Sequence, residues 1–445
     1  FSKGFSSLLP KLRNSGGVIV TADINRNGRL EIFIGGRVIP GEYPSSPISS
    51  ILQNSGKNYI DVTNEIAPEI KQSGMVTSAM FSDVDNDNWP DLLVTYEWGP
   101  IRFFHNEQGT LIDRTNDVGL FEKFGWFNSI SGGDIDNDGD TDFVIGNTGY
   151  NTKYKASIGN PEILFYGDFE GTGKKNIVEA KYEEDICFPR RGLGCSSDAM
   201  PIIKEKFPTY HEFAISSVNE IYSPELLSSA DRYEVNELAS GILFNNTDST
   251  GNIEFVFKAL PRIVQSSPVF GSTICDVNGD GNLDIYVVQN FSGPQRETGY
   301  MHGGVSQLLL GDGSGTFEPI PPDESGLIVP GDATTLTIHD FNDDNRVDFL
   351  VGVNDGKFES FINQINAESI SLRLPDFPRG KRYIGSKVWV YYSDNSLQLH
   401  EVFGGGGYLS HSAPIVFVGN VKGIKKVIIE WPDGFKEKID IHKDL

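Results

Sequence analysis

Residues that supply most catalytic and redox chemistry are scarce in this sequence. It contains three Cys, four Met and seven His among 445 residues. The histidines show no metal-ligand spacing such as H-E-x-x-H, and no nucleophile elbow is present. The histidines are His105, His211, His302, His339, His400, His411 and His442. We therefore expect a protein without enzymatic activity.

The three cysteines are too few for a disulfide framework. Cys187 and Cys195 are eight residues apart in a loop rich in Pro, Gly and Arg, so a bridge between them is possible but not required. Cys275 lies in an apolar segment and is expected to be a buried thiol.

Positive charge and long apolar runs are also lacking. Lys and Arg number 37 against 61 Asp and Glu, which gives a net charge of −24. Such an acidic chain is not expected to bind nucleic acid. No apolar run is long enough to predict a transmembrane segment. Residue 1 is Phe rather than Met, so the absence of a signal peptide does not argue against export.

The charge is unevenly distributed along the chain. From Asn366 onward there are 11 basic and 9 acidic residues, a balance of +2. The preceding part carries the other 26 basic and 52 acidic residues, a balance of −26. This asymmetry predicts two domains, residues 1–365 and residues 366–445.

The clearest feature present is a nine-residue acidic pattern, best seen from Asp134 to Asp142. Oxygen-bearing side chains occupy positions 1, 3, 5 and 9, position 7 can offer its carbonyl, and Gly139 at position 6 permits a sharp turn. Hard cations such as Ca²⁺ take six to eight oxygen ligands in a flexible shell, so the spacing predicts a calcium loop.

The pattern occurs six times, so up to six Ca²⁺ are expected. Asn88 and Asn345 replace the glycine at position 6, and Asn tolerates a left-handed backbone. The copies that begin at Asp23 and Asp168 are the weakest, and metal-free Asp/Asn/Gly turns are the alternative. The predicted ligands are Asp23, Asn25, Asn27, Arg29, Glu31, Asp83, Asp85, Asp87, Trp89, Asp91, Asp134, Asp136, Asp138, Asp140, Asp142, Asp168, Glu170, Thr172, Lys174, Asn176, Asp276, Asn278, Asp280, Asn282, Asp284, Asp340, Asn342, Asp344, Arg346 and Asp348.

Short β-rich segments flank each acidic loop, so each loop is expected to join two strands rather than the two helices of an EF-hand. The second copy shows four candidate strands, at 76–81, 91–98, 101–106 and 111–115. Such repeats predict an all-β fold, a seven-bladed propeller over residues 1–365. One blade, at about 230–265, would lack a metal loop, and about 198–229 would form a helical insertion.

Strand alternation places the loops that follow the second strands on the face opposite the metal loops. These loops combine Arg, Asn, Trp and Tyr, which suits a polar, ring-bearing ligand such as a glycan, or a protein loop. Alternatively, they fill the channel mouth and brace one another. The predicted ligand-binding residues are Arg37, Tyr43, Trp98, Asn151, Lys153, Tyr154, Arg190, Arg191, Arg296 and Tyr300.

The C-terminal part predicts strands at 369–374, 387–392, 398–403, 415–418 and 426–431. Four glycines, 404–407, follow the third of these strands. No Lys-Ser/Thr follows them in P-loop register, so we expect a close backbone approach rather than a phosphate cradle.

Several motifs carry a family resemblance. The acidic loops resemble the FG-GAP/VCBS repeats of integrin-α-type propellers. The run Ile384-Gly-Ser-Lys-Val, the segment 401–410 (EVFGGGGYLS) and the segment 430–434 (EWPDG) resemble the ASPIC/UnbV domain. Four interior motifs are similar to those of large exported VCBS-repeat ASPIC/UnbV proteins of Bacteroidota and relatives. They are GGRV (35–38), NTKYKAS (151–157), RGLGCSSDAMP (191–201) and VPGDA (329–333). The resemblance implies calcium binding and a location outside the cell, at the cell surface in association with the outer membrane.

Together these features predict a calcium-stabilised surface module that captures a glycan or a protein ligand. It could belong to an outer-membrane assembly with transporter or lipoprotein subunits. The alternatives are a structural scaffold that docks other surface proteins and, less favoured, a polysaccharide-active enzyme.

Overall fold

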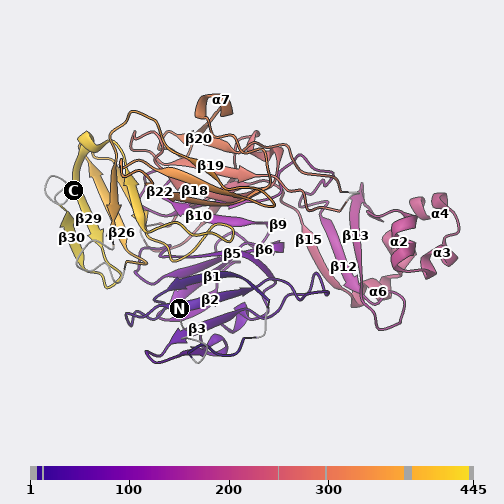
Figure 1. Cartoon of the computed structure of the whole chain (residues 1–445). Helices are drawn as coiled ribbons and strands as arrows, with labels where there is room; N and C mark the ends of the chain where they lie inside the picture. Colours follow the sequence, from indigo (N-terminus) through magenta and orange to yellow (C-terminus); the bar gives the residue numbers. More distant parts are fainter. Residues whose placement is uncertain (1–7, 13–14, 249, 296–297, 375–382, 440–445) are drawn as a thin grey trace.

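The computed structural model describes residues 8–12, 15–248, 250–295, 298–374 and 383–439 (Figure 1). Most regular structure in these residues is antiparallel β-sheet, as the alternation of apolar and polar residues predicts. No described helix combines the length and apolar character needed to cross a membrane.

Five sheets, numbered here 1 to 5, form the body of the protein. Sheet 1 contains β1 (Gly16–Ala22), β2 (Glu31–Gly36), β3 (Ser50–Asn54) and β4 (Tyr59–Asp61). Sheet 2 contains β5 (Met75–Ser82), β6 (Asp91–Pro100), β7 (Arg102–Glu107), β8 (Thr110–Asp113) and β9 (Phe124–Trp126). Sheet 3 contains β10 (Ser129–Gly133), β11 (Asp142–Gly146), β16 (Gly241–Asn245) and β17 (Phe255–Ala259). Sheet 4 contains β18 (Val269–Cys275), β19 (Asp284–Gln289), β20 (Gln307–Gly311) and β21 (Phe317–Ile320). Sheet 5 contains β22 (Ala333–His339), β23 (Asp348–Val353) and β24 (Glu359–Phe361).

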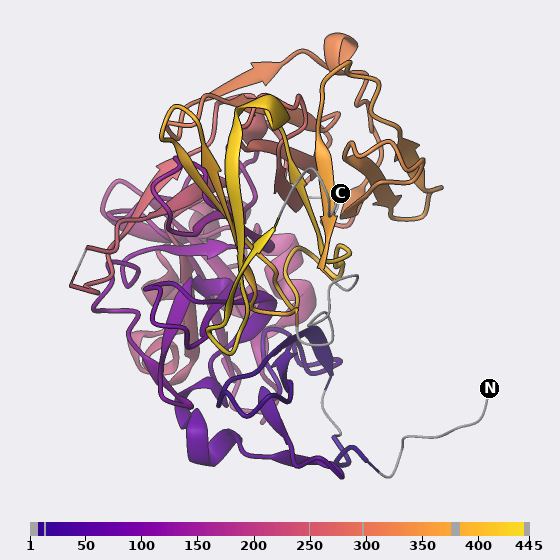
Figure 2. The ribbon, with the colours of Figure 1, turned by 90° about the vertical axis from the view of Figure 1, so that its left-hand side faces the viewer.

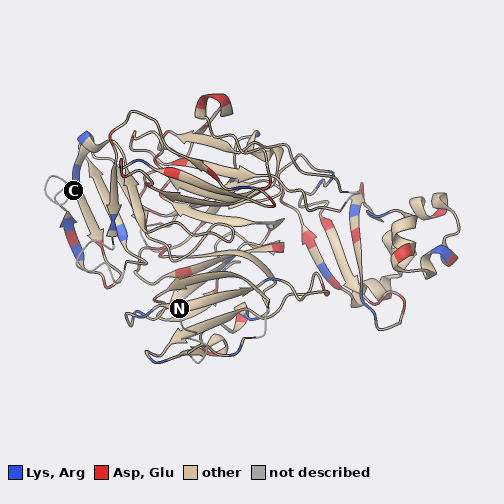
Figure 3. Ribbon diagram, viewed as in Figure 1, with Lys and Arg blue, Asp and Glu red and all other residues tan. Residues whose placement is uncertain are grey.

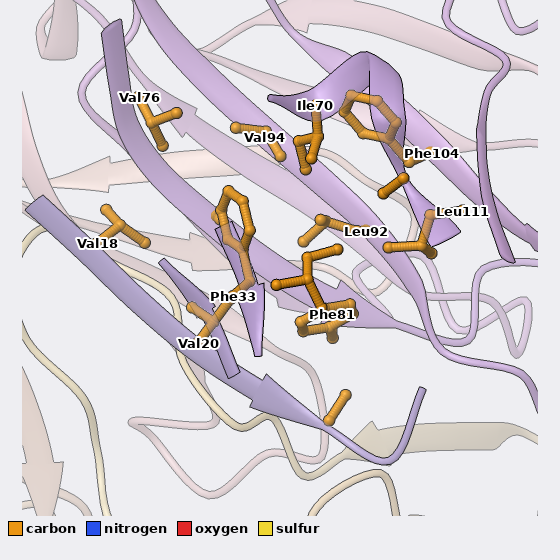
Figure 4. Close-up of a cluster of buried hydrophobic side chains, with 14 of the residues drawn as sticks. Val18, Val20, Phe33, Ile70, Val76, Phe81, Leu92, Val94, Phe104 and Leu111 are labelled. Atoms are coloured by element: carbon orange, nitrogen blue, oxygen red, sulfur yellow. The ribbon is translucent and has the colours of Figure 1, made fainter. Parts of the chain in front are cut away.

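The first strands of the five sheets lie side by side in chain order (Figure 1). Apolar side chains of neighbouring sheets interlock between them. Between sheets 1 and 2, for example, Val20 and Phe33 meet Phe81 and Leu92 in one buried cluster (Figure 4). This arrangement is propeller-like, and the four strands predicted for the second repeat correspond to β5, β6, β7 and β8.

The prediction of seven blades is not confirmed. Strand β11 pairs directly with β16, with Phe143 opposite Leu243. The hairpin expected to be a silent blade therefore forms the outer half of sheet 3. The acidic loop at 168–176 belongs to an inserted sheet between β11 and β16. Local sequence patterns cannot show this, because the pairing connects strands about a hundred residues apart.

The insertion is also larger than the predicted 198–229. Its sheet contains β12 (Glu162–Gly167), β13 (Asn176–Glu183), β14 (Ile186–Pro189) and β15 (Asp231–Val235). Five short helices extend from it on the side away from the C-terminal domain (Figure 1). They are α2 (Leu193–Ala199), α3 (Ile202–Lys206), α4 (Tyr210–Ile215), α5 (Val218–Tyr222) and α6 (Pro224–Ser229).

The C-terminal domain consists of two small sheets. One pairs β25 (Ile370–Arg373) with β28 (Ile415–Val418), and the other contains β26 (Lys387–Tyr392), β27 (Leu397–Glu401), β29 (Ile424–Glu430) and β30 (Lys436–Ile439). The five predicted strands are confirmed, and β30 is additional. Figure 2 shows this domain, in yellow, in front of the sheets of the body, on the side that faces the viewer.

Five single-turn elements complete the described structure. They are α1 (Thr63–Ile66), η1 (Pro68–Ile70), η2 (Val264–Ser266), α7 (Pro322–Ser325) and η5 (Val421–Gly423).

Candidate functional site

The six acidic loops share one backbone conformation. In every loop the residues at positions 4 and 6 have a positive φ. At position 6, Asn88 and Asn345 have φ of 70° and 67°, close to the 81° of Gly28. Asn therefore fills the glycine role, as predicted. The left-handed residue at position 4, which is Asn137 in the best copy, was not predicted, since the amino acid there varies between copies.

The carboxylate at position 9 has a structural role in each of the five sheets. In sheet 5, Asp348 accepts one hydrogen bond from the N–H of Phe341, at position 2 of its own loop, and one from the N–H of Asn363, both at 2.8 Å. Because Asn363 lies just beyond the third strand, Asp348 connects the loop to that strand. The fully buried carboxylates with this pair of bonds are Glu31, Asp91, Asp142, Asp284 and Asp348.

In sheets 2, 3 and 5, an Asn side-chain amide at the end of the third strand donates a hydrogen bond to the previous sheet. Asn106 Nδ2 donates to the carbonyl of Ile24 at 3.0 Å, and Asn245 Nδ2 donates to that of Val84 at 2.8 Å. Asn363 makes the equivalent bond to Val277 at 2.8 Å. Each acceptor is position 2 of the preceding sheet's acidic loop. An Asn at the end of a strand is visible in the sequence, but the sequence does not show which carbonyl this Asn contacts.

The loop from Asp134 to Asp142 fits a divalent cation. Asp134, Asp136 and Asp138 each offer an oxygen, and these oxygens lie within 4.8 Å of one another. Oδ1 of Asp134 and Oδ1 of Asp136 are buried and have no hydrogen-bond donor among the described residues. Burial raises the pKa of Asp134 to about 7 and that of Asp142 to about 9. A bound cation would offset this cost of burying carboxylates.

The C-terminal domain lies against the acidic loops of the five sheets, and this side of the molecule is called the loop face below. The N–H of Leu399 donates to Oδ2 of Asp134 at 2.8 Å. Arg373 pairs with Asp343, at 3.0 Å, in the loop of sheet 5. Figure 3 shows basic residues on the C-terminal strands at this end of the molecule. The acidic N-terminal part and the more basic C-terminal part of the sequence therefore form two surfaces that contact each other at the loop face.

The loop of the inserted sheet differs from the other five. Asp168 accepts from the N–H groups of Thr172 and Gly173, at 3.1 and 2.6 Å. These backbone hydrogen bonds, the one from Gly173 above all, lower the pKa of Asp168. Position 9 is Asn176, whose side-chain nitrogen is buried without a described acceptor. The loop lies on a separate sheet, so it does not take part in the loop face.

On the opposite side of the molecule, the loops after the second strands enclose a cavity of about 620 Å³. Five of the predicted ligand-binding residues line this aromatic cavity: Arg37, Tyr43, Trp98, Tyr154 and Arg191. The alternation of strands and loops thus predicted that these five residues lie on one side of the molecule, and the structure brings them together there.

The aromatic cavity has a wall of stacked rings. The rings of Trp98 and Trp126 meet edge to face at 4.8 Å, and those of Trp126 and Tyr154 lie 4.6 Å apart. Trp126 was missed, because it lies on the irregular strand β9 rather than in a loop after a second strand. Such rings offer flat apolar surfaces of the kind that sugar rings contact.

Polar groups of the aromatic cavity are fixed by one another. Arg37 pairs with Glu97, and Glu97 accepts a hydrogen bond from the hydroxyl of Tyr43 at 2.7 Å. The Tyr43 oxygen in turn accepts from Trp98 Nε1 at 2.6 Å. Burial, with the nearby Glu97 carboxylate, raises the pKa of Tyr43. Across the cavity, Arg191 pairs with Glu179 at 2.9 Å. These side chains therefore brace one another, as the alternative interpretation of the loops predicts, and ligand binding by them stays a prediction.

The other predicted ligand-binding residues do not line the aromatic cavity. Arg190 donates a hydrogen bond to Glu162 at 3.0 Å. Its guanidinium group also lies over the ring of Tyr154, 4.4 Å from the ring centroid. Asn151 donates to the Ser266 carbonyl at 3.0 Å. Lys153 and Tyr300 are outside the lining, and Arg296 lies outside the described residues.

The glycine segment, residues 404–407, connects the loop face with the aromatic cavity. The carbonyl of Gly404 accepts from the N–H of Thr21 on β1 at 3.0 Å, and the N–H of Gly407 donates to Ile130 on β10 at 2.7 Å. A Cβ on Gly404 would lie 2.0 Å from the Thr21 carbonyl oxygen. The predicted close backbone approach is confirmed. The next residue, Tyr408, lines the cavity and packs its ring 5.1 Å from that of Phe270.

The three cysteines are free thiols. Cys275 is buried, as predicted, and burial raises the pKa of its thiol. Cys195 lies at the rim of the aromatic cavity.

Two solved rhamnogalacturonan lyases are distantly similar to this chain. An exotype rhamnogalacturonan lyase, YesX, is 11% identical with a TM-score of 0.32, and the match covers 79% of this chain and 57% of that one. The Bacillus licheniformis rhamnogalacturonan lyase PL11 is 10% identical with a TM-score of 0.31, over 89% and 72% of the two chains. The present chain thus spans little more than half the length of YesX. No curated protein sequence matches it.

Family models match two parts of the sequence. The FG-GAP-like repeat model matches residues 83–145 and 276–351, which include the acidic loops of sheets 2, 3, 4 and 5. The ASPIC and UnbV model matches residues 379–443. The chain therefore contains FG-GAP-like repeats and, at its C-terminus, an ASPIC and UnbV domain.

Proposed function

We propose that this chain is a non-catalytic, calcium-stabilised binding module of the cell surface, and that it captures a glycan in the aromatic cavity. The observation that carries the proposal is the convergence of Trp98, Trp126 and Tyr154 with two Arg–Glu pairs in one cavity. Aromatic faces contact the apolar faces of sugar rings, while fixed charged pairs offer donors and acceptors to hydroxyl groups.

The charges of the aromatic cavity favour a neutral ligand. Arg37 is paired with Glu97, and Arg191 with Glu179. Neither arginine is therefore an uncompensated cation that would select a uronic acid or a phosphate. A neutral oligosaccharide can exchange hydrogen bonds with these pairs without separating them, so it suits the cavity better than an anionic one.

A glycan array in the presence of calcium tests this proposal. The double variant Trp98→Ala, Arg191→Ala removes one ring and one charged pair from the aromatic cavity, and it should lose binding. Tyr300→Ala is the matched control, because Tyr300 is 78% exposed and outside the lining. Equal binding by both variants would place the ligand elsewhere. An array without any signal would favour the scaffold alternative, in which the ligand is another surface protein.

Calcium is proposed to hold the acidic loops, first of all the loop from Asp134 to Asp142. An ion that binds only the folded chain stabilises it by mass action, by about 2.7 kcal/mol when its free concentration is 100 times Kd. EDTA should therefore lower the melting temperature. Asp136→Ala should reduce this response, whereas Arg29→Ala should not, since position 7 offers only its carbonyl. An unchanged melting temperature in EDTA would contradict calcium binding.

A polysaccharide-active enzyme is the second candidate, because two carboxylates, Glu97 and Glu179, line the same cavity. Each of them forms an ion pair with an arginine, so a substrate would have to compete with that arginine for the carboxylate. Incubation with a panel of oligosaccharides distinguishes the two functions. Product formation that Glu97→Gln abolishes would establish the enzyme.

A further inference from the structure

A lysine of the C-terminal domain enters the acidic loop of sheet 2. Lys387, on β26, places Nζ 2.6 Å from Oδ2 of Asp83, the position 1 carboxylate of that loop. It also bonds to the side-chain oxygen of Asn86, at position 4. The side chains of Lys387 and Asp83 are only 5% and 8% exposed, so water screens this ion pair little.

Asp83 has further partners in the loop and in the C-terminal domain. Both of its carboxylate oxygens accept from the N–H of Asn88, at 3.1 and 3.0 Å. Glu401 of β27 accepts from the N–H of Asp83 at 3.2 Å, which fixes the C-terminal strand pair against the loop. Asp85 and Asp87, two further acids of this loop, have side-chain oxygens within 4.8 Å of a His105 ring nitrogen, a grouping that could itself hold a cation. Nδ1 of His105 also lies 2.9 Å from Oδ1 of Asp91. Basic side chains therefore face this loop from two directions.

The neighbouring loop of sheet 3 shows the contrast. The same strand pair approaches it, but there β27 offers only the N–H of Leu399 to Asp134. Oδ1 of Asp134 has no donor among the described residues. In the loop of sheet 2, the ammonium group of Lys387 therefore contacts the carboxylate at position 1. In the loop of sheet 3, one oxygen of the position 1 carboxylate is buried without a hydrogen-bond donor among the described residues.

We infer that Lys387 replaces the metal ion in the loop of sheet 2, and that this internal cation anchors the C-terminal domain on the loop face. The inference is an alternative to the prediction that Asp83, together with Asp85, Asp87, Trp89 and Asp91, forms a calcium site. It rests on the proposed calcium binding only for the comparison between loops.

Counting bound calcium by native mass spectrometry tests the first part. Asp83→Asn should leave the number of bound ions unchanged, because Lys387 rather than calcium uses this carboxylate. Asp134→Asn, the same change in the neighbouring loop, should lower the number by one. Loss of one ion in Asp83→Asn would overturn the inference.

A double-mutant cycle tests the ion pair without depending on calcium. Lys387→Met and Asp83→Asn should each lower the melting temperature, by roughly 5 °C for a broken buried pair. The double variant should lose clearly less than the sum, and the coupling should be equal in EDTA and in calcium. Additive losses, or coupling that disappears when calcium is added, would overturn the inference. If the unmodified chain binds no calcium, the calcium proposal fails, while the cycle still decides the role of Lys387.

Discussion

At the residue scale, the carboxylate at position 9 connects an acidic loop to its sheet. Each oxygen of the buried Asp348 carboxylate accepts a part-buried backbone N–H, one from Phe341 and one from Asn363. Buried backbone N–H groups need acceptors, and an ionised carboxylate can serve two at once. The sequence predicted Asp348 as a metal ligand from its spacing alone. Spacing cannot distinguish an oxygen that faces a metal from one that faces an N–H, so this role was missed.

The bracing role predicts a large effect for a nearly isosteric change. Asp348→Asn replaces one acceptor oxygen with an NH₂ group that faces an N–H donor. We expect a loss of about 1–3 kcal/mol in the free energy of unfolding, because a buried donor is left unsatisfied. Urea unfolding in EDTA measures it without a metal contribution. The control is Glu318→Gln on β21, where the carboxylate is exposed, and equal stability of the two variants would contradict the bracing role.

At the element scale, the junctions between sheets depend on an amide as well as on apolar packing. Asn245, at the end of β16, donates to the carbonyl of Val84 in the loop of sheet 2. Sheet 4 has Gly311 at the equivalent place, where no side chain can reach sheet 3. The junction of sheets 3 and 4 therefore relies on other contacts, such as the bond between the hydroxyls of Ser131 and Ser272 at 2.6 Å.

Removing one such amide should weaken its junction. Asn245→Ala leaves the Val84 carbonyl without its donor, and we expect a cost of about 1–3 kcal/mol. Hydrogen exchange should show faster exchange in β5 and β10, the strands on either side of that junction. Asn252→Ala, in the exposed turn before β17, is the control. A uniform change in exchange over all five sheets would argue against a local role for Asn245.

Strands and loops could be predicted from the sequence because both patterns are local. The nine-residue frame located the turn at 83–91, and alternation located β6 beyond it. The insertion could not be predicted, because the pairing of Phe143 with Leu243 joins strands from distant parts of the chain. The same limit applied to the aromatic cavity. Trp98 was predicted in a loop and lies near the end of β6, whereas Tyr408 comes from the C-terminal domain, and no local pattern links the two.

At the scale of the whole molecule, the C-terminal segment contacts both the loop face and the aromatic cavity. It contacts the Asp134 loop at Leu399, passes β1 and β10 as the glycine segment, and presents Tyr408 to the aromatic cavity. Further along, the hydroxyl of Ser412 accepts from the N–H of Ile338 on β22 at 3.2 Å. Contacts with both β1 and β22 connect the two ends of the series of five sheets. The domain therefore stabilises the arrangement of the sheets as well as covering the loop face.

A single methyl group added at Gly404 should disturb the packing of the glycine segment against β1. In Gly404→Ala the new Cβ would lie 2.0 Å from the Thr21 carbonyl oxygen, a backbone atom that cannot move aside as a flexible side chain can. We expect a cost of about 1–3 kcal/mol from overpacking. Displacement of the segment should also increase the radius of gyration in small-angle scattering and weaken glycan binding through Tyr408. Gly192→Ala is the control, because a Cβ there meets no atom within 4 Å. Unchanged scattering together with unchanged melting in Gly404→Ala would mean that the segment is not held between the sheets. Lower stability with intact glycan binding would separate its structural role from a role in the aromatic cavity.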